Sequence, residues 1–123
     1  MRQVIDVTIV AISASLCVAC ATVAAHDPMS AYYSNTLHET RANGTQSWFL
    51  FNADHTFRST NQDGKAITGS WTLNAQSETC ISIDGSDRPP PPCAKLQAKK
   101  IGDNWDRQGP AGNEHFVLEA GRK

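Results

Sequence analysis

Hydrophobic and polar residues alternate along much of the chain with a period of two. The clearest stretch runs from Ile67 to Leu73, where every second residue is apolar or glycine and the residues between are threonine or serine. Such alternation is typical of a β-strand that has one buried and one solvated face. We therefore predict a strand over residues 66–74, with the Trp71 side chain in the core.

Turn dipeptides separate further runs of this kind. Asn43-Gly44, Asp63-Gly64 and Asp84-Gly85 readily adopt positive φ and are typical of β-hairpins. The predicted strands cover residues 36–42, 46–52, 55–60, 66–74, 78–83, 93–98, 103–107 and 115–120. Short strands at near-regular spacing predict an all-β domain, a small antiparallel up-and-down barrel or sandwich of about seven or eight strands.

A short helix is predicted at the start of this β-rich region. Asp27 is a favourable N-cap, and Pro28 at the first helical position gives up no hydrogen bond that the helix needs. Residues 28–33 are therefore expected to form one or two helical turns. The remaining core candidates are large apolar residues of the predicted strands: Trp48, Leu50, Phe57, Trp105, Phe116 and Leu118.

The first 25 residues have the three parts of a secretory signal peptide. Arg2 supplies a positive charge, an uncharged apolar run spans residues 7–23, and Val23-Ala24-Ala25 offers the small residues that cleavage requires. We expect removal of residues 1–25. Residues 26–123 then form a single β-rich domain, periplasmic or secreted, with no transmembrane span in the mature form.

Two alternatives to simple cleavage stay open. The apolar run is about 17 residues long, close to the roughly 20 that a membrane-spanning helix needs, so retention as an anchor is one of them. The other is lipidation. The stretch Leu16-Cys17-Val18-Ala19-Cys20 partly matches a bacterial lipobox, although its leucine lies one place too early. This match makes Cys20 the candidate for a lipid anchor.

The mature domain keeps two cysteines, Cys80 and Cys93, and an even pair in an oxidising compartment predicts a disulfide. Strand parity agrees with the count. Ile81 and Leu96 are expected to face inward, so both cysteines face outward on strands that we expect to be neighbours. No CxxC spacing or adjacent histidine favours a metal or redox pair instead.

Charge and composition limit the classes of molecule that the protein is expected to bind. The chain has 11 Lys and Arg against 12 Asp and Glu, a formal net charge of −1, which argues against a nucleic-acid binder. The stretch Arg88-Pro89-Pro90-Pro91-Pro92 is extended and donates few hydrogen bonds. It is either a rigid arm for an aromatic groove or a stiff connector between strands. The connector is favoured because the predicted disulfide ties both ends.

The chain contains, in order, the motifs Asn35-Thr36, Trp48-Phe49, residues 52–57, residues 69–73, Cys80 with Cys93, and residues 102–105. Together these resemble the motifs of small exported proteins of alphaproteobacteria, the uncharacterised DUF995-like group, which are lipocalin-like in the loose sense. The resemblance implies an exported β-barrel-like fold and brings no established activity and no catalytic residue. His55 replaces the glycine usual in the family's turn, and Ser70 replaces the usual threonine.

Histidine spacing gives no zinc signature, because no HxH or HxxxH pattern occurs. Cleavage after residue 25 would make His26 the first residue, whose amine and imidazole together form a clamp suited to Cu(II). His55 is the candidate second ligand, because it lies in a predicted turn beside Asp54. A periplasmic copper-binding protein that uses His26 and His55 is therefore one functional hypothesis.

Catalytic motifs are not evident. The sequence has no G-x-S-x-G, and its turn carboxylates are of the kind that solvated turns commonly carry. The leading hypothesis is a non-enzymatic binding or accessory module of the cell envelope, lipocalin-like in type. It would hold a small apolar ligand in the barrel or an envelope protein at the rim. The alternatives are the copper-binding protein and an inhibitor of an envelope hydrolase.

Overall fold

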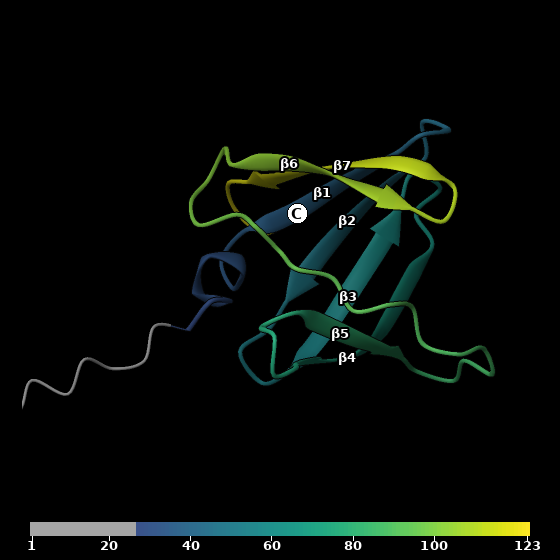
Figure 1. Ribbon diagram of the computed structural model, residues 1–123, viewed down its shortest axis with the longest axis horizontal. Coiled ribbons are helices and arrows are strands. Elements are labelled where there is room, and N and C mark those ends of the chain that lie inside the picture. The colour runs from purple at the N-terminus through teal and green to yellow at the C-terminus, as the bar shows by residue number, and fades with distance from the viewer. Residues whose placement is uncertain (1–26) are drawn as a thin grey trace, which may run out of the picture.

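The computed structural model describes residues 27–123, which form seven strands and one turn of 3-10 helix (Figure 1). The elements in chain order are η1 (Ser30–Tyr32), β1 (Thr36–Arg41), β2 (Gln46–Phe51), β3 (Thr56–Asn61), β4 (Ala66–Leu73), β5 (Thr79–Ile83), β6 (Asn104–Gly109) and β7 (Gly112–Glu119). In this part of the chain no helix is long and apolar enough to cross a bilayer.

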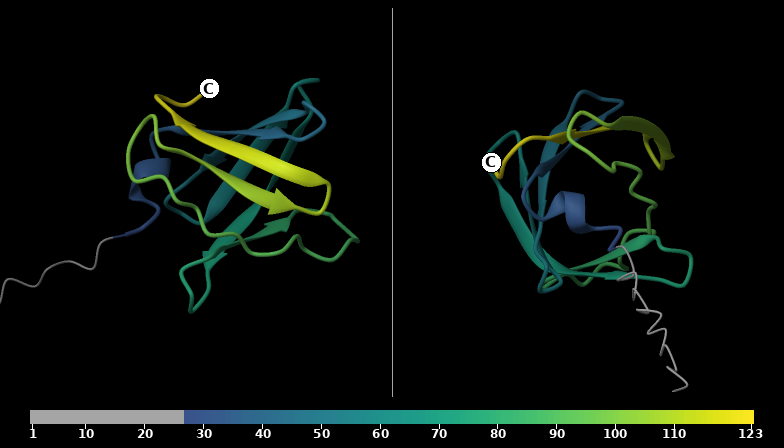
Figure 2. Two further views of the ribbon diagram at one scale, coloured as in Figure 1. Left: turned by 45° about the horizontal axis from the view of Figure 1, so that its top comes forward. Right: turned by 90° about the vertical axis from the view of Figure 1, so that its left-hand side faces the viewer.

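All strand pairs are antiparallel, and the strands form one sheet in the order β5-β4-β3-β2-β1-β7-β6. The sheet curls on itself into a half-barrel, so its two edge strands, β5 and β6, border the open side of the barrel (Figure 2). The chain between them, residues 84–103, spans the opening. The predicted all-β antiparallel class is confirmed, including the sequential hairpins from β1 to β5 and from β6 to β7.

The strand predicted over residues 93–98 is wrong. One isolated bridge joins Ala94 to Thr79, with N–O distances of 2.7 and 2.9 Å. Beyond it the Ala98 N–H donates to the Tyr32 hydroxyl at 2.9 Å, and the following Lys99 N–H donates to the Asp103 carboxylate. The chain thus leaves the edge of β5 after one bridge, and a side-chain acceptor satisfies the Ala98 donor that a ladder would otherwise have paired.

The predicted N-terminal helix is a single 3-10 turn. The Asp27 carboxylate accepts a hydrogen bond from Met29 N–H at 2.9 Å, which satisfies one donor at the start of the turn. Met29 and Tyr32 are each 1% exposed and belong to the core. In the right-hand view of Figure 2 the turn lies inside the ring of strands, so it plugs this end of the barrel.

The core is an aromatic cluster around Trp71, which is 2% exposed, as predicted. The Phe51 ring meets Trp71 edge-on at 6.4 Å between centroids, a favoured aromatic geometry. Gly69 is required beside them. A Cβ there would lie 1.9 Å from the Ser82 carbonyl oxygen and 2.7 Å from the Phe57 ring. The inward face of β4 is therefore assigned correctly by its alternation.

The inward placement of Trp48 and Leu50 is wrong. Phe49 and Phe51 of β2 face the core instead, and Trp48 and Leu50 lie on the outer surface. Four consecutive apolar residues, Trp48 to Phe51, leave the parity of this strand undecided by pattern alone. The pairing of Phe51 with Phe57 settles it, because both rings join the core cluster. The other four core candidates, Phe57, Trp105, Phe116 and Leu118, are buried.

Candidate functional site

Trp48 and Leu50, which the sequence predicted to be buried, form the main feature of the outer surface. Trp48 and Leu50 of β2 stand directly opposite Thr60 and Arg58 of β3. With Lys123 these four side chains line an open hollow of about 570 Å³. We call the outer surface formed by His38, Trp48, Leu50, Arg58 and Thr60 the Trp48 face.

His38 extends this surface onto β1. It pairs with Trp48 across the β1–β2 ladder, and the two rings lie parallel, 5.0 Å apart with an interplanar angle of 11°. Its Nε2 is 2.7 Å from Oε1 of Gln46, and its Nδ1 is 3.5 Å from Oε1 of Glu119. The ring is thus held by a stacking contact and by polar groups on both nitrogens. Trp48 in turn has a fixed neighbour on one side.

Glu119 closes the patch at the end of β7. Its Oε1 is buried and accepts no hydrogen bond from the residues described. The His38 Nδ1 lies 3.5 Å from it and the Lys123 ammonium nitrogen 3.7 Å from it. The Trp48 face therefore combines an aromatic and aliphatic platform with cationic and hydrogen-bonding side chains around it, a composition found at protein-binding hot spots.

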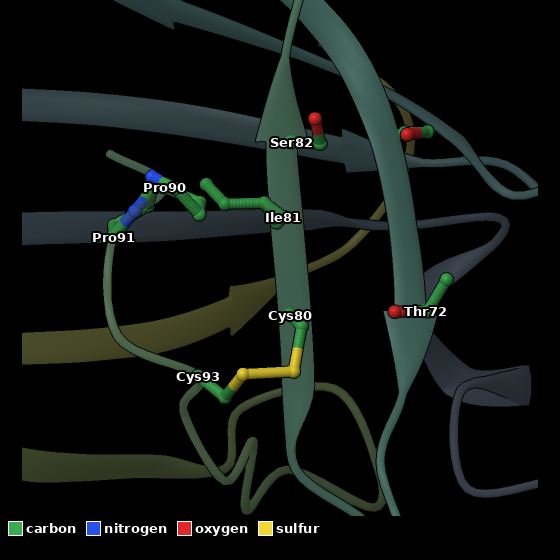
Figure 3. Close-up of a pocket in the computed structure, with 8 residues that line it drawn as sticks. Thr72, Cys80, Ile81, Ser82, Pro90, Pro91 and Cys93 are labelled. Carbon is green, nitrogen blue, oxygen red and sulfur yellow. A yellow bond between two sulfur atoms is a disulfide. The ribbon is translucent and has the colours of Figure 1, made fainter. Parts of the chain in front are cut away.

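A second hollow, of about 180 Å³, lies beside the disulfide (Figure 3). The Cys80–Cys93 disulfide is present, with the two Cα atoms 4.3 Å apart, which confirms the predicted bridge. Pro90 and Pro91 run alongside Ile81 of the edge strand β5 in this view. Their position agrees with the connector interpretation, in which the proline stretch flanks a strand edge without extending its ladder.

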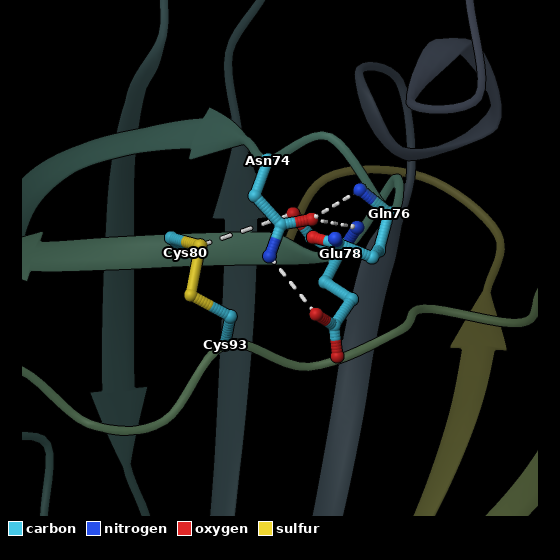
Figure 4. The surroundings of a disulfide bond; sticks show 5 residues. All are labelled: Asn74, Gln76, Glu78, Cys80 and Cys93. Atoms are coloured by element: carbon cyan, nitrogen blue, oxygen red, sulfur yellow. Dashed lines mark hydrogen bonds between the residues drawn. A yellow bond between two sulfur atoms is a disulfide. The ribbon is translucent and has the colours of Figure 1, made fainter.

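The turn beside the disulfide is held by its own side chains (Figure 4). Asn74 Oδ1 accepts hydrogen bonds from the backbone N–H groups of Gln76 and Glu78, at 3.0 and 2.9 Å. Asn74 Nδ2 donates to the Glu78 carboxylate at 2.9 Å. These bonds fix the β4–β5 connection next to Cys80, so the polar groups here serve the turn.

The barrel interior holds a charged cluster that sequence reasoning missed. Glu39 of β1 and Glu114 of β7 are 4% and 8% exposed. Each has its own arginine: Arg41 Nε donates to Glu39 at 3.2 Å, and Arg107 Nη2 donates to Glu114 at 2.6 Å. Burial raises the pKa of the Glu39 carboxyl, and Arg41 partly opposes this shift. The cluster therefore forms two ion pairs, each of which joins a buried carboxylate to a partly exposed guanidinium group.

One sign of this cluster was present in the sequence. Glu39 lies two residues after Leu37, and two residues before Arg41, so all three share one face of β1. A buried Leu37 therefore implies an inward Glu39. The usual exclusion of charged residues from cores points the other way. The alternation outweighs it here because arginine partners stand at the same end of the strand.

His55, the candidate copper ligand, packs against the core. Its ring lies parallel to Trp71 at 4.2 Å, and its Nδ1 is 3.1 Å from the Trp71 carbonyl oxygen. Asp54 does not orient this ring, because its carboxylate accepts hydrogen bonds from Thr56 N–H and Oγ1 at 3.0 and 2.6 Å. His55 thus stacks on the buried indole and is itself exposed on its other side.

The copper hypothesis stays a prediction, because His26 lies outside the described residues. Within residues 27–123, no group of three or more His, Cys, Asp or Glu side chains is placed to hold a metal ion. His115 Nδ1 lies 2.8 Å from Asp106 on the outer surface. This pair is the surface contact expected of an exposed histidine beside a carboxylate.

Comparison with family models, with curated proteins and with solved structures finds no match for this chain. The resemblance to exported alphaproteobacterial proteins therefore stays an expectation based on the motifs quoted above. Functional inference depends on the chain's own surface, of which the Trp48 face is the most distinctive part.

Proposed function

We propose that this protein is a non-enzymatic binding module of the cell envelope that engages an envelope protein through the Trp48 face. The proposal rests on the outward position of Trp48. A soluble β-barrel normally buries so large an apolar side chain, and here Leu50 lies beside it on the same face. An interface that covers both residues removes this apolar surface from water.

Two further features support a protein partner. Trp and Arg are over-represented among residues that dominate binding energy, and Trp48 and Arg58 both line the same hollow. His38 also restricts the Trp48 ring before any partner arrives. Such preorganisation lowers the entropy lost on binding.

A ligand held inside the barrel is less well supported. The inward positions are occupied by large side chains, and η1 inserts Met29 and Tyr32 from one end. A small apolar ligand would have to displace part of this cluster. We therefore favour the outer surface over the interior as the binding region.

The proposed envelope location draws on two observations. The signal-peptide pattern of residues 1–25 favours export, and the Cys80–Cys93 disulfide is compatible with an oxidising compartment. The intact mass of the exported protein checks both. We expect a chain that begins at His26 and has lost two hydrogens through disulfide formation. A chain that begins at a lipid-modified Cys20 would instead support the lipoprotein alternative.

Site-specific photo-crosslinking in the native envelope tests the proposed function. A photoreactive residue at Thr60 is expected to give a discrete protein adduct, and Trp48→Ala should abolish it. The matched control is the same photoreactive residue at Thr68, which is exposed on the outer face of β4. Equal adducts from positions 60 and 68, or an adduct at 60 that survives Trp48→Ala, would contradict the proposal.

A further inference from the structure

One large hydrophobic side chain is more than half exposed to solvent. Ile101 is 55% exposed, and within residues 27–123 no other large hydrophobic residue is comparably exposed. It lies in the connection between residue 98 and β6, preceded by Lys99 and Lys100 and followed by Gly102. We call residues 99–102 the Ile101 tip.

The Ile101 tip is held in place by hydrogen bonds on both sides. The Asp103 carboxylate accepts from Lys99 N–H at 2.9 Å and from Lys100 N–H at 3.2 Å. Gly102 N–H donates to the Leu118 carbonyl at 2.8 Å and has a φ of 90°, which a side chain would strain. Exposure of Ile101 is therefore built into the turn.

The charges of the tip face solvent. Neither the Lys99 nor the Lys100 ammonium group forms an ion pair with another residue of the described chain. The Asp103 carboxylate accepts both backbone N–H groups at its Oδ2 and also interacts electrostatically with Lys99 and Lys100. Two lysines that form no ion pair within residues 27–123 thus directly precede one exposed aliphatic side chain.

The tip lies at the end of the barrel where the described chain begins. In Figures 1 and 2 the connection that precedes β6 and the η1 turn share this end, and the Tyr32 hydroxyl accepts the Ala98 N–H. The sequence that precedes Asp27 contains the apolar run of residues 7–23 and Cys20. In the proposed role of a signal peptide this run would enter the membrane during export, and Asp27, the first described residue, lies at the same end of the barrel as the tip.

We propose that the Ile101 tip is a membrane-contact site for a surface rich in anionic phospholipid. Ile101 enters the boundary between headgroups and acyl chains, and Lys99 and Lys100 bind the lipid phosphates. One aliphatic side chain with two lysines gives weak, reversible contact, and membrane attachment by such elements generally requires two signals. The tip therefore acts with a second attachment or serves a transient contact.

Vesicle co-sedimentation of the exported form, residues 26–123, tests this site. We expect binding to vesicles that mix phosphatidylglycerol with phosphatidylcholine, weaker binding to phosphatidylcholine alone, and loss of binding as salt increases. Lys99→Gln with Lys100→Gln should lower the partition coefficient about thirtyfold, at about fivefold for each removed lysine. Ile101→Ser should lower it roughly tenfold.

The matched charge control is Lys65→Gln. Lys65 is exposed in the β3–β4 turn, at the other end of the barrel, and forms no ion pair within the described chain. The Lys65→Gln variant should bind vesicles as the unmodified protein does. Thermal unfolding of each variant shows whether the domain stays folded, because these surface substitutions should leave its midpoint unchanged.

A labelled variant locates the contact. An environment-sensitive dye on Ile101→Cys should shift to shorter wavelength with anionic vesicles, and the same dye on Lys65→Cys should not. The proposal is overturned if the protein does not bind anionic vesicles, if the Ile101 and lysine variants bind as well as the unmodified chain, or if both dye positions respond equally.

Discussion

His38 and Trp48 stack face to face on the outside of the barrel, with ring centroids 5.0 Å apart, across the ladder between β1 and β2. Both residues lie on a solvated sheet face, where aromatic stacking contributes modestly to stability. Their contact therefore orients a binding surface more than it holds the fold together.

This arrangement predicts that Trp48→Ala separates binding from stability. We expect a loss of roughly 1–2 kcal/mol in the free energy of unfolding, because a partly exposed ring and one stacking contact are removed. Loss of affinity for the partner should reach at least about 2 kcal/mol, as at interface hot spots. Urea denaturation measures the free energy of unfolding, and titration with the partner identified by photo-crosslinking measures the affinity. A large stability loss with unchanged affinity would contradict the assignment.

Trp71→Ala is the matched core substitution, because Trp71 is 2% exposed and packs against Phe51 and His55. Removal of the indole leaves a cavity among aromatic rings and also frees the Asn52 carbonyl, to which Trp71 Nε1 donates at 2.9 Å. We expect a loss of about 3–5 kcal/mol in the free energy of unfolding. An unfolding midpoint equal to that of Trp48→Ala would refute the distinction between the two faces.

The disulfide is expected to supply a substantial part of the stability of so small a domain. Cys80 and Cys93 are 13 residues apart, and closure of a loop of this size contributes about 3 kcal/mol. The double variant Cys80→Ala with Cys93→Ala should unfold at a correspondingly lower urea concentration. Addition of a reductant should destabilise the unmodified protein and leave the double variant unchanged. A reductant effect on both would point to a cause other than this bond.

Glu39 predicts a pH dependence of stability. Burial raises the pKa of its carboxyl above the ordinary value of 4.5, so the folded state binds this proton more tightly than the unfolded state. The stability linked to this proton is fully present below pH about 4.5 and is lost as pH rises through the folded-state pKa. Glu39→Gln should remove this loss, so its advantage over the unmodified protein should grow from pH 4 to pH 7.

Other carboxyl groups give stability the opposite pH dependence. The effect of Glu39 is therefore measured as the difference in stability between Glu39→Gln and the unmodified protein at each pH. Hydrogen bonds lower the pKa of Asp54, Asp103 and Asp106, and the stability linked to them is lost as pH falls. Asp63→Asn, in the exposed β3–β4 turn, serves as the charge-matched control. If Asp63→Asn and Glu39→Gln show the same pH-dependent difference, the assignment to burial of Glu39 is wrong.

Strand positions were predictable where local chemistry was unambiguous. Asn43-Gly44 and Asp63-Gly64 marked the β1–β2 and β3–β4 hairpins, whereas Asp84-Gly85 ends β5 and forms no hairpin. The Gly69 and Trp71 alternation oriented β4 correctly. The outward position of Trp48 was not predictable, because consecutive apolar residues fit either parity and only pairing with β3 chooses between them. The Trp48 face therefore depends on long-range register, which a strand-by-strand pattern does not contain.

Residues 93–98 show a different kind of failure. Their alternation was correct, with Leu96 packed against the core, Ala98 buried, and Lys95 and Gln97 exposed. Alternation reports which side chains face inward, and it holds for any extended chain along a core. Ladder formation also requires backbone partners on a neighbouring strand, and here pairing with β5 stops after the Thr79–Ala94 bridge, while the Ala98 N–H donates to the Tyr32 hydroxyl.

A closed barrel has as many ladders as strands, but this sheet joins seven strands by six. No ladder joins β5 to β6. On this open side the Thr79–Ala94 bridge and the neighbouring Cys80–Cys93 disulfide attach β5 to the connection that spans the opening. Solvent should reach the amides of β5 before those of β3, which has a ladder on each side. Reduction of the disulfide therefore removes the covalent link at the edge strand β5, where the sheet has the least backbone pairing to resist local opening.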